Sequence, residues 1–233
     1  MYEITQIRKL SLWIFLIPLI AINLCLIISQ NPEFLENTIF KVDQIGRSGF
    51  SIPYFDGSLS ISRASRTFPQ YLIFKPSMIL TAFLVYFYWK NNNNLVNHLN
   101  FSNVNYKFKI FGIISALFLV IHSILLGVEY DFKIFKLLRR VVLLSFIIFE
   151  IIAQGLLVYH FFKLKKKLEN YINKKILILK IILVTILATI AILSIPILID
   201  EGNTHFKHAL EWNYFVGVIS FYLLSNFFWK KFI

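Results

Sequence analysis

Residues 10–29, "LSLWIFLIPLIAINLCLIIS", form a continuous apolar stretch without a single charged side chain. An α-helix rises about 1.5 Å per residue, so a stretch of this length matches the roughly 30 Å hydrocarbon core of a bilayer. It follows Arg8 and Lys9, as the apolar region of a signal peptide would. The apolar run is too long for a signal peptide, and no small-residue cleavage site follows it. We therefore predict a retained first transmembrane helix.

Similar apolar stretches recur along the rest of the chain. The predicted spans are 10–29, 71–89, 109–128, 140–162, 176–199 and 209–229. Their apolar residues are continuous, whereas strands of a membrane barrel alternate in polarity. The whole chain is 58% hydrophobic and 15% charged, against about 45–50% and 25% for soluble domains. The sequence predicts an all-α integral membrane protein, a six-transmembrane-helix bundle forming a single domain over 1–233.

Lysine and arginine in the short connections predict the orientation of the bundle, because cytoplasmic loops are enriched in these residues. The densest cluster is "KLKKKLENYINKK" at 163–175. With six spans this cluster lies on the same side as both termini, so we expect both termini in the cytoplasm. The net charge of +12 is then explained by orientation and anionic headgroups rather than by nucleic acid. The single cysteine, Cys25, cannot form an intrachain disulfide.

The connection over residues 30–70 is the only long one on the outer side. Its segment "SIPYFDGSLSISRASRTFPQ" at 51–70 contains Asp56-Gly57, a pair typical of tight turns. Its isoleucine, tyrosine and phenylalanine residues argue against full disorder, so we expect this outer loop to cap the bundle. The asparagine-rich segment 91–105 is predicted to be a solvated cytoplasmic loop.

Ionisable side chains inside spans are costly and usually face the bundle interior. The predicted outer half contains His122, Glu150, His208 and Glu211, with Gln154 one turn after Glu150. His208 and Glu211 are three residues apart and Glu150 and Gln154 four apart, so each pair shares a helix face. In the other half, we expect Lys180 and His160 to lie near enough to the interface to reach it by snorkelling.

These four acid–base side chains would converge if the third, fourth and sixth spans pack together. Asp56, Arg63 and Arg66 of the long loop would then lie above them as candidate ligand-binding residues. Two carboxylates and two imidazoles in one low-dielectric pocket would shift one another's pKa, as acid–base catalysis requires. Alternatively, the carboxylates only fix helix packing by hydrogen bonds, and the arginines contact lipid phosphate, a carboxylate or solvent. The spacing H-x-x-H-x-x-E matches no common zinc motif, so no metal or cofactor is predicted.

Several short motifs resemble those of the Frag/DRAM/Sfk superfamily of six-span membrane proteins. "PYFDGSLSIS" at 53–62 followed by "PQYLIF" at 69–74 is similar to its turn before the second span, and "ALEW" at 209–212 to the start of its sixth span. His122-Ser123 lies where the third span of the family commonly has a histidine. The resemblance implies a role linked to membrane lipids, and its candidate positions are Asp56, Pro69, Gln70, His122 and Glu211.

Three functions remain open from the sequence. The first is a membrane protein whose outer polar pocket binds or remodels a lipid headgroup or lipid-linked glycan, with or without enzymatic activity. The second is a small transporter, which needs a continuous polar route across the membrane. The third is a structural subunit of a membrane complex, with other membrane proteins as partners.

Overall fold

The computed structural model of the chain describes residues 2–35, 38–39, 51–98, 107–128, 133–199 and 202–230. Every named element in these ranges is a helix. The long helices are α1 (Tyr2–Gln30), α4 (Gln70–His98), α5 (Lys107–Leu125), α6 (Lys133–Lys163), α7 (Lys174–Leu193) and α9 (Thr204–Phe228). The short ones are η1 (Pro32–Leu35), α2 (Pro53–Asp56), α3 (Ile61–Ser65) and α8 (Ile195–Ile199).

Five of the long helices are apolar and long enough to cross a membrane: α1, α4, α5, α7 and the Leu137–Lys163 part of α6. They indicate an integral membrane protein of the all-α class, as the composition predicts. The helix over the predicted sixth span, α9, has 25 residues but contains more polar side chains, and it is not among these five. A count of six spans therefore stays a prediction.

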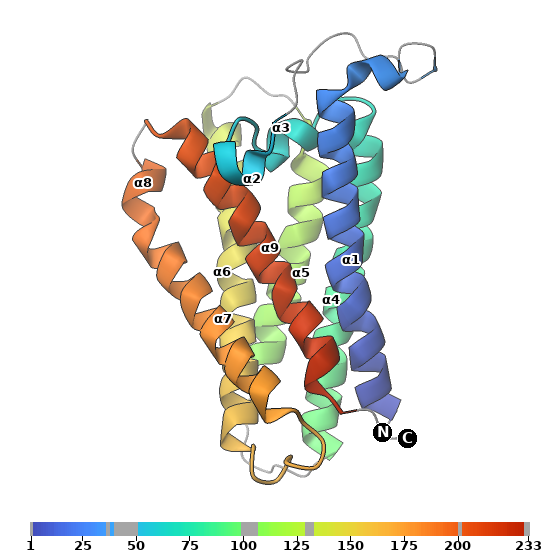
Figure 1. The fold of residues 1–233 in the computed structure, drawn as a ribbon, viewed down its shortest axis with the longest axis vertical. Helices are drawn as coiled ribbons and strands as arrows, with labels where there is room; N and C mark the ends of the chain where they lie inside the picture. Colours follow the sequence, from blue (N-terminus) through green and yellow to red (C-terminus); the bar gives the residue numbers. More distant parts are fainter. Residues whose placement is uncertain are drawn as a thin grey trace.

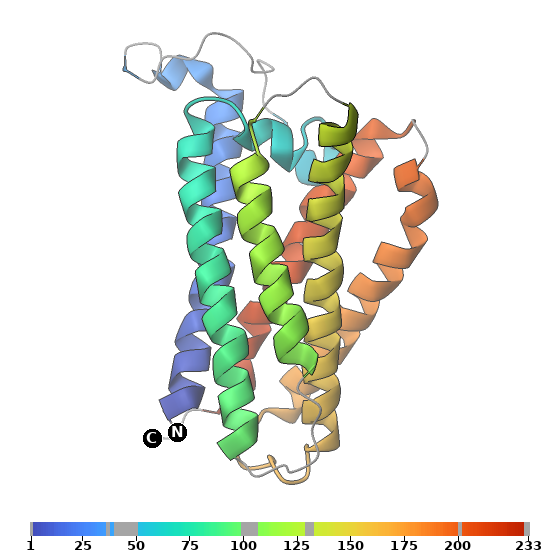
Figure 2. The ribbon, with the colours of Figure 1, turned by 180° about the vertical axis from the view of Figure 1, so that it is seen from behind.

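Helices that follow one another along the chain pack side by side, from α1 and α4 through α5 and α6 to α7. α9 contacts both α7 and α1 and runs diagonally along the bundle (Figure 1). In the view from behind, α4, α5 and α6 lie in front of it (Figure 2). Near its end, Asn226 accepts a hydrogen bond from Arg8 Nε (3.1 Å, to the carbonyl oxygen) and donates one to the Arg8 carbonyl (2.8 Å).

The start of α1 and the end of α9 therefore share one end of the bundle, which we call the terminal end. The opposite end, with α2 and α3, is the cap end (Figure 1). The described residues thus show both chain ends on one side, but which side faces the cytoplasm stays a prediction.

Two large hydrophobic clusters fill the bundle, one in each half. In the terminal half the fully buried Trp89 of α4 packs against Phe108 of α5, with ring centroids 6.2 Å apart. A Cβ atom on Gly112 of α5 would lie 2.4 Å from the Trp89 ring, so only glycine lets the two helices approach this closely. In the cap half the fully buried Trp212 of α9 belongs to the second cluster.

Local sequence signals explain where α7 begins and ends. The Asn173 side chain accepts a hydrogen bond from the backbone N–H of Lys175 (3.0 Å), which caps the first turn. The helix ends at Leu193, and α8 starts at Ile195 with Pro196 at its second position, where the missing N–H costs nothing. The predicted span 176–199 is therefore divided between two helices.

The asparagine-rich segment was expected to be a loop over 91–105, and for its first part this is wrong. α4 continues to His98, and Asn92 and Asn93 are both buried. The Asn92 side-chain amide donates a hydrogen bond to the Tyr88 carbonyl (2.8 Å), so this donor is paired within the helix. Val96 is fully buried one turn later, so tertiary packing outweighs the low helix propensity of asparagine. Residues 99–106 lie outside the described ranges.

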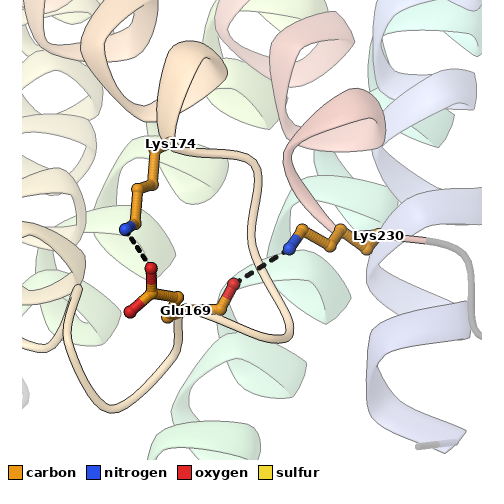
Figure 3. Close-up of polar contacts among 3 residues, drawn as sticks. All are labelled: Glu169, Lys174 and Lys230. Carbon is orange, nitrogen blue, oxygen red and sulfur yellow. Dashed lines mark hydrogen bonds and ion pairs between the residues drawn. The ribbon is translucent and has the colours of Figure 1, made fainter.

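The basic connection between α6 and α7 is fastened to the end of the chain (Figure 3). Asn173 donates its backbone N–H to the Phe228 carbonyl (2.8 Å), and Lys230 Nζ donates to the Glu169 carbonyl (3.0 Å). The Glu169 carboxylate forms an ion pair with Lys174, whose hydrogen bond lowers the pKa of this carboxyl. The terminal end therefore presents an ordered basic surface.

The predicted outer loop 30–70 is described only in part, because residues 36–37 and 40–50 lie outside the described ranges. Residues 51–69, which we call the cap, contain α2 and α3. α2 packs against α9, while α3 packs against α1, α4 and α9. Gln30 at the end of α1 donates a hydrogen bond to the Ser51 carbonyl (2.8 Å), which holds the start of the cap.

Candidate functional site

The cap begins with a turn that the Asp56-Gly57 pair forms. The Asp56 carboxylate accepts hydrogen bonds from the backbone N–H groups of Ile52 (2.9 Å) and Ser58 (2.8 Å). The bond from Ser58 is the main cause that lowers the pKa of the Asp56 carboxyl. Gly57 ends α2 with a φ of 58°, the left-handed conformation that glycine adopts at low cost. The sequence prediction of a turn here agrees with this geometry.

Two histidines of α9 hold this turn from the side. His205 Nδ1 lies 3.2 Å from the Asp56 carbonyl oxygen, and His208 Nδ1 lies 2.9 Å from the Gly57 carbonyl oxygen. A carbonyl oxygen only accepts, so in each ring Nδ1 must carry the proton. Both histidines at the start of α9 therefore contact the cap backbone.

Glu211 binds the next element of the cap. Its carboxyl accepts hydrogen bonds from the backbone N–H groups of Ile61 and Ser62, the first residues of α3. These N–H groups have no partner within the helix, and an anion at a helix N-terminus is favourable. The Ser60 side chain accepts from the Arg63 N–H (3.1 Å), so the first turn of α3 is capped from both sides.

Aromatic and amide side chains complete the attachment of the cap. The Trp212 indole donates to the Leu59 carbonyl (2.7 Å), and Asn213 donates to the Tyr54 carbonyl (2.7 Å). The Tyr54 ring lies 4.8 Å from the Trp212 ring, centroid to centroid, and its hydroxyl donates to Asn23 of α1 (3.1 Å). The cap is therefore tied to α1 and α9 together.

The cationic residues predicted in this segment lie on its surface. Arg63 is exposed, Arg66 is half-buried, and neither forms an ion pair with the described residues. The ring of Phe55 is 86% exposed. Gln70, by contrast, is buried at the start of α4, where its side chain contacts Thr67 (3.1 Å). Of Arg63, Arg66 and Gln70, the two arginines therefore reach the surface and Gln70 does not.

Glu150 belongs to a different polar cluster, deep inside the bundle. Its carboxyl accepts hydrogen bonds from Ser115 Oγ of α5 (2.6 Å), from Gln154 Nε2 (3.0 Å) and from the Tyr222 hydroxyl of α9. Gln154 Nε2 also donates to the Val218 carbonyl (3.3 Å). Glu150 and Gln154 do share a helix face, as their spacing predicts, and this face points toward α9.

Lys180 was expected to reach the interface, and this is wrong. Its side chain is only 1% exposed. Its Nζ donates to Ser225 Oγ (2.7 Å) and lies 3.9 Å from the centroid of the Phe221 ring. α9 crosses this part of α7 and covers the lysine. A hydropathy pattern cannot reveal this, because it contains no information about which helix packs on which.

The structure does not join His122 to the other candidates. No hydrogen bond or ion pair within the described residues links His122 to Glu150 or Glu211. The physical reason is the order of packing, since α5 packs on α4 and α6, while α9 packs on α1 and α7. The predicted acid–base residues thus lie in separate places: His208 and Glu211 under the cap, and Glu150 in the interior. Glu129, which follows the third predicted span, lies outside the described residues.

Sequence reasoning missed the hydroxyl groups that surround Glu150 and Lys180. They come from Tyr88, Ser115, Tyr222 and Ser225, and all four side chains are buried. The spacing of Tyr222 and Ser225, three residues apart on one helix face, is the only local signal that could have indicated them. In the described part of the chain, no three His, Cys, Asp or Glu side chains lie close enough to hold a metal ion.

Comparison with known proteins returned no matching family model, no matching curated protein and no matching solved structure. The resemblance to the Frag/DRAM/Sfk superfamily therefore stays a prediction from short motifs. Of its candidate positions, Asp56 lies in the cap, and Glu211 of α9 binds the cap at Ile61 and Ser62.

Proposed function

We propose that this protein spans the membrane six times and binds, at its cap, the phosphate of a lipid headgroup or of a lipid-linked glycan. The observation that supports this binding site most directly is the exposed side chain of Arg63. It is exposed on a cap that α9 holds firmly at the end of a bundle of apolar helices, and it has no ion-pair partner among the described residues. Arginine presents a planar set of N–H donors that matches phosphate oxygens.

The surroundings of Arg63 support a position at the membrane surface. Phe55 and Phe68 in the cap are 86% and 39% exposed, and Ile52 is 42% exposed. Apolar and aromatic side chains at a bundle end favour the interface between hydrocarbon and headgroups. The lipid phosphates lie at this level, within reach of an arginine on the cap.

The contacts of His208 and Glu211 favour binding rather than catalysis. Both side chains bond to cap backbone, through the Gly57 carbonyl and the N–H groups of α3. Their polar atoms are therefore used to position the cap. Their role is to hold the binding surface in place, and they perform no chemical step on the lipid.

We infer that α9 is the sixth span. Its first turns bond to the cap through His208, and its last turns bond to Arg8 at the terminal end. Its two ends therefore lie at opposite ends of the bundle, which supports a sixth crossing of the membrane. The lysines of the 163–175 connection and Lys230 favour a cytoplasmic terminal end, which leaves the cap outside.

Orientation is tested by labelling single cysteines. Two variants are made in a Cys25→Ala background: Ser62→Cys in the cap and Lys166→Cys in the basic connection. Intact cells that express each variant are treated with a membrane-impermeant maleimide. Labelling at Ser62 alone is expected. Labelling at Lys166 alone, or at both positions in sealed cells, contradicts the proposed topology.

Binding is tested with native mass spectrometry of the purified protein. The two probes are phosphatidylglycerol and a polyprenyl-phosphate sugar, each compared with phosphatidylcholine, and the tighter ligand identifies the source of the phosphate. Arg63→Gln is expected to weaken binding of that ligand at least tenfold, the size of one charged hydrogen bond. Lys166→Gln removes the same charge at the other end and is the matched control. Equal binding by wild type and Arg63→Gln contradicts the proposal.

Transport is a second candidate that one observation favours. The half of the bundle at the terminal end contains the buried polar side chains of Asn92, Lys180 and Ser225. A transporter needs a polar route through both halves. Accessibility labelling of cysteines along α7 and the inner part of α5 tests this, since a route makes successive positions on one face reactive from water.

A further inference from the structure

Several polar atoms in the bundle interior lack a hydrogen-bond partner among the described residues. Three of them belong to α4, namely Trp89 Nε1, Asn92 Oδ1 and Asn93 Oδ1, and one to α6, Gln154 Oε1. Another, Ser65 Oγ, lies in the cap. Buried polar groups are almost always hydrogen-bonded, either to protein or to ordered water. The four atoms on α4 and α6 therefore indicate that something binds between them.

The contacts of the Gln154 amide fix its orientation. Its Nε2 donates to Glu150 Oε1 (3.0 Å) and to the Val218 carbonyl (3.3 Å). Turning the amide over would place Oε1 against these two oxygen atoms. Gln154 Oε1 is therefore a buried acceptor next to the Glu150 carboxyl, and it requires a donor.

The Trp89 indole brings a donor to the same place. Trp89 is 0% exposed, and its indole lies close enough to the Glu150 carboxyl and the Tyr222 hydroxyl to interact with both. It reaches neither with ordinary hydrogen-bond geometry, so its N–H has no bonded partner among the described residues. A donor close to oxygen atoms that it does not bond is the arrangement that a bridging water completes.

Two asparagines continue this set of polar groups along α4. Asn92 follows Tyr88 by four residues and Asn93 follows Trp89 by four, so each asparagine shares a helix face with one aromatic residue. The Asn92 amide donates to the Tyr88 carbonyl, which leaves Oδ1 of Asn92 as an acceptor without a partner. α4 ends at His98, so both asparagines lie between Trp89 and the terminal end of the bundle.

The part of α4 in the cap half is different. Its buried side chains Phe74, Met78 and Ala82 belong to the hydrophobic cluster of that half. Its buried hydroxyl, that of Thr81, donates to the Ser77 carbonyl (2.8 Å) and so already has a partner. Within the described part of α4, the unpaired polar atoms therefore lie only toward the terminal end.

We propose that ordered water molecules bind inside the terminal half of the bundle and reach the Glu150 carboxyl from the terminal end. One water accepts from the Trp89 N–H and donates to Gln154 Oε1. Further waters donate to the two asparagine oxygens and connect this site to solvent. Buried waters typically make about three hydrogen bonds to groups that lack other partners, and this set of donors and acceptors matches that requirement.

This water-filled half-route ends at Glu150. It therefore differs from the transport pathway considered above, which would have to continue through the cap half. It also does not depend on Arg63 or on the binding of a phosphate at the cap.

X-ray radiolytic footprinting of the protein in nanodiscs tests for this water. The pulse converts bound water to hydroxyl radicals in place, so a tryptophan beside a bound water is oxidised even when it is buried. Trp212 is the internal control, because it is also 0% exposed but its indole already donates to the Leu59 carbonyl. Trp89 is expected to be oxidised roughly tenfold faster than Trp212, or more. Equal oxidation rates of the two tryptophans overturn the proposal.

Asn93→Leu tests the direction from which the water arrives. The variant replaces the amide with an apolar side chain of similar size, and oxidation of Trp89 is expected to fall roughly tenfold. Thr81→Val removes a paired hydroxyl from the cap half of the same helix and is the matched control, which should leave oxidation of Trp89 unchanged. Unchanged oxidation in Asn93→Leu contradicts entry of water from the terminal end.

Thermal stability provides a second readout from Asn93→Leu. In a dry interior, leucine would replace a buried, unpaired carbonyl oxygen, and the variant should melt at a higher temperature than the wild type. With water bound to Asn93 Oδ1, the variant loses that hydrogen bond and should melt no higher than the wild type. A raised melting temperature contradicts the proposal. Because Arg63 is unchanged in both variants, phosphate-lipid binding at the cap should persist whichever way these measurements end.

Discussion

Replacing Gly57 with alanine is expected to detach the cap from α9. A Cβ atom at this position would lie 1.7 Å from the backbone carbonyl oxygen of His205, half the 3.4 Å at which ordinary contact begins. A backbone atom within a helix cannot rotate away, so the turn itself must move. The movement separates the Gly57 carbonyl from His208 and the Asp56 carbonyl from His205.

The size of the effect follows from three contributions. An alanine at a φ of 58° costs about 1–2 kcal/mol relative to glycine. The two hydrogen bonds from the histidines contribute about 1 kcal/mol each. Together they destabilise the attached cap by about 3–4 kcal/mol. Since about 1.4 kcal/mol corresponds to a factor of ten, the population of detached cap rises about a hundredfold or more.

Hydrogen–deuterium exchange by mass spectrometry measures this population directly. Peptides covering residues 51–65 should exchange about a hundredfold faster in Gly57→Ala, while peptides from α5 and α6 should be unchanged. Gly155→Ala in α6 is the matched control, because its added Cβ would meet only Val184 Cγ1 at an ordinary 3.6 Å. It should stabilise its helix slightly. Equal exchange of the cap peptides in wild type and Gly57→Ala would refute the assignment of the cap to α9.

Two further outcomes are expected. Glu211→Ala removes the carboxyl at the start of α3 and should weaken the cap by about 1–2 kcal/mol, seen as faster exchange of the Ile61–Ser65 peptide; an unchanged rate would contradict that contact. The hydrogen bonds that Asp56 accepts lower the pKa of its carboxyl from the usual value of 3.8. The Asp56 carboxylate therefore stabilises the turn fully above that pH. This stabilisation is lost as the pH falls through the lowered pKa. The near-ultraviolet circular dichroism of Tyr54 and Trp212 should report this loss, which Asp56→Asn removes.

Several parts of the fold can be predicted from local patterns. Each predicted span lies mostly in one long helix, because twenty consecutive apolar residues leave few alternatives to a membrane helix. The Asp56-Gly57 turn is also local, since glycine at a positive φ and an Asx side chain create it from adjacent residues. The asparagine-rich end of α4 is the exception, where buried packing of Val96 outweighed propensity.

The candidate site could be predicted only in part. The spacing of His208 and Glu211 indicates one polar face on α9, but their partners are backbone atoms of the cap, about 150 positions earlier in the chain. Nothing in the local sequence shows that these groups meet. The same holds for Lys180, which the hydropathy pattern leaves at the interface and which α9 encloses.

The amino-acid sequence by itself determined that this chain is a helical membrane protein, because hydrophobic length and the hydrogen-bonding needs of the backbone are properties of each segment alone. Only the tertiary structure decided which polar groups share a site. That choice depends on the order in which helices pack, and α9 reaches the cap with its first turns and Glu150 with Tyr222 further along.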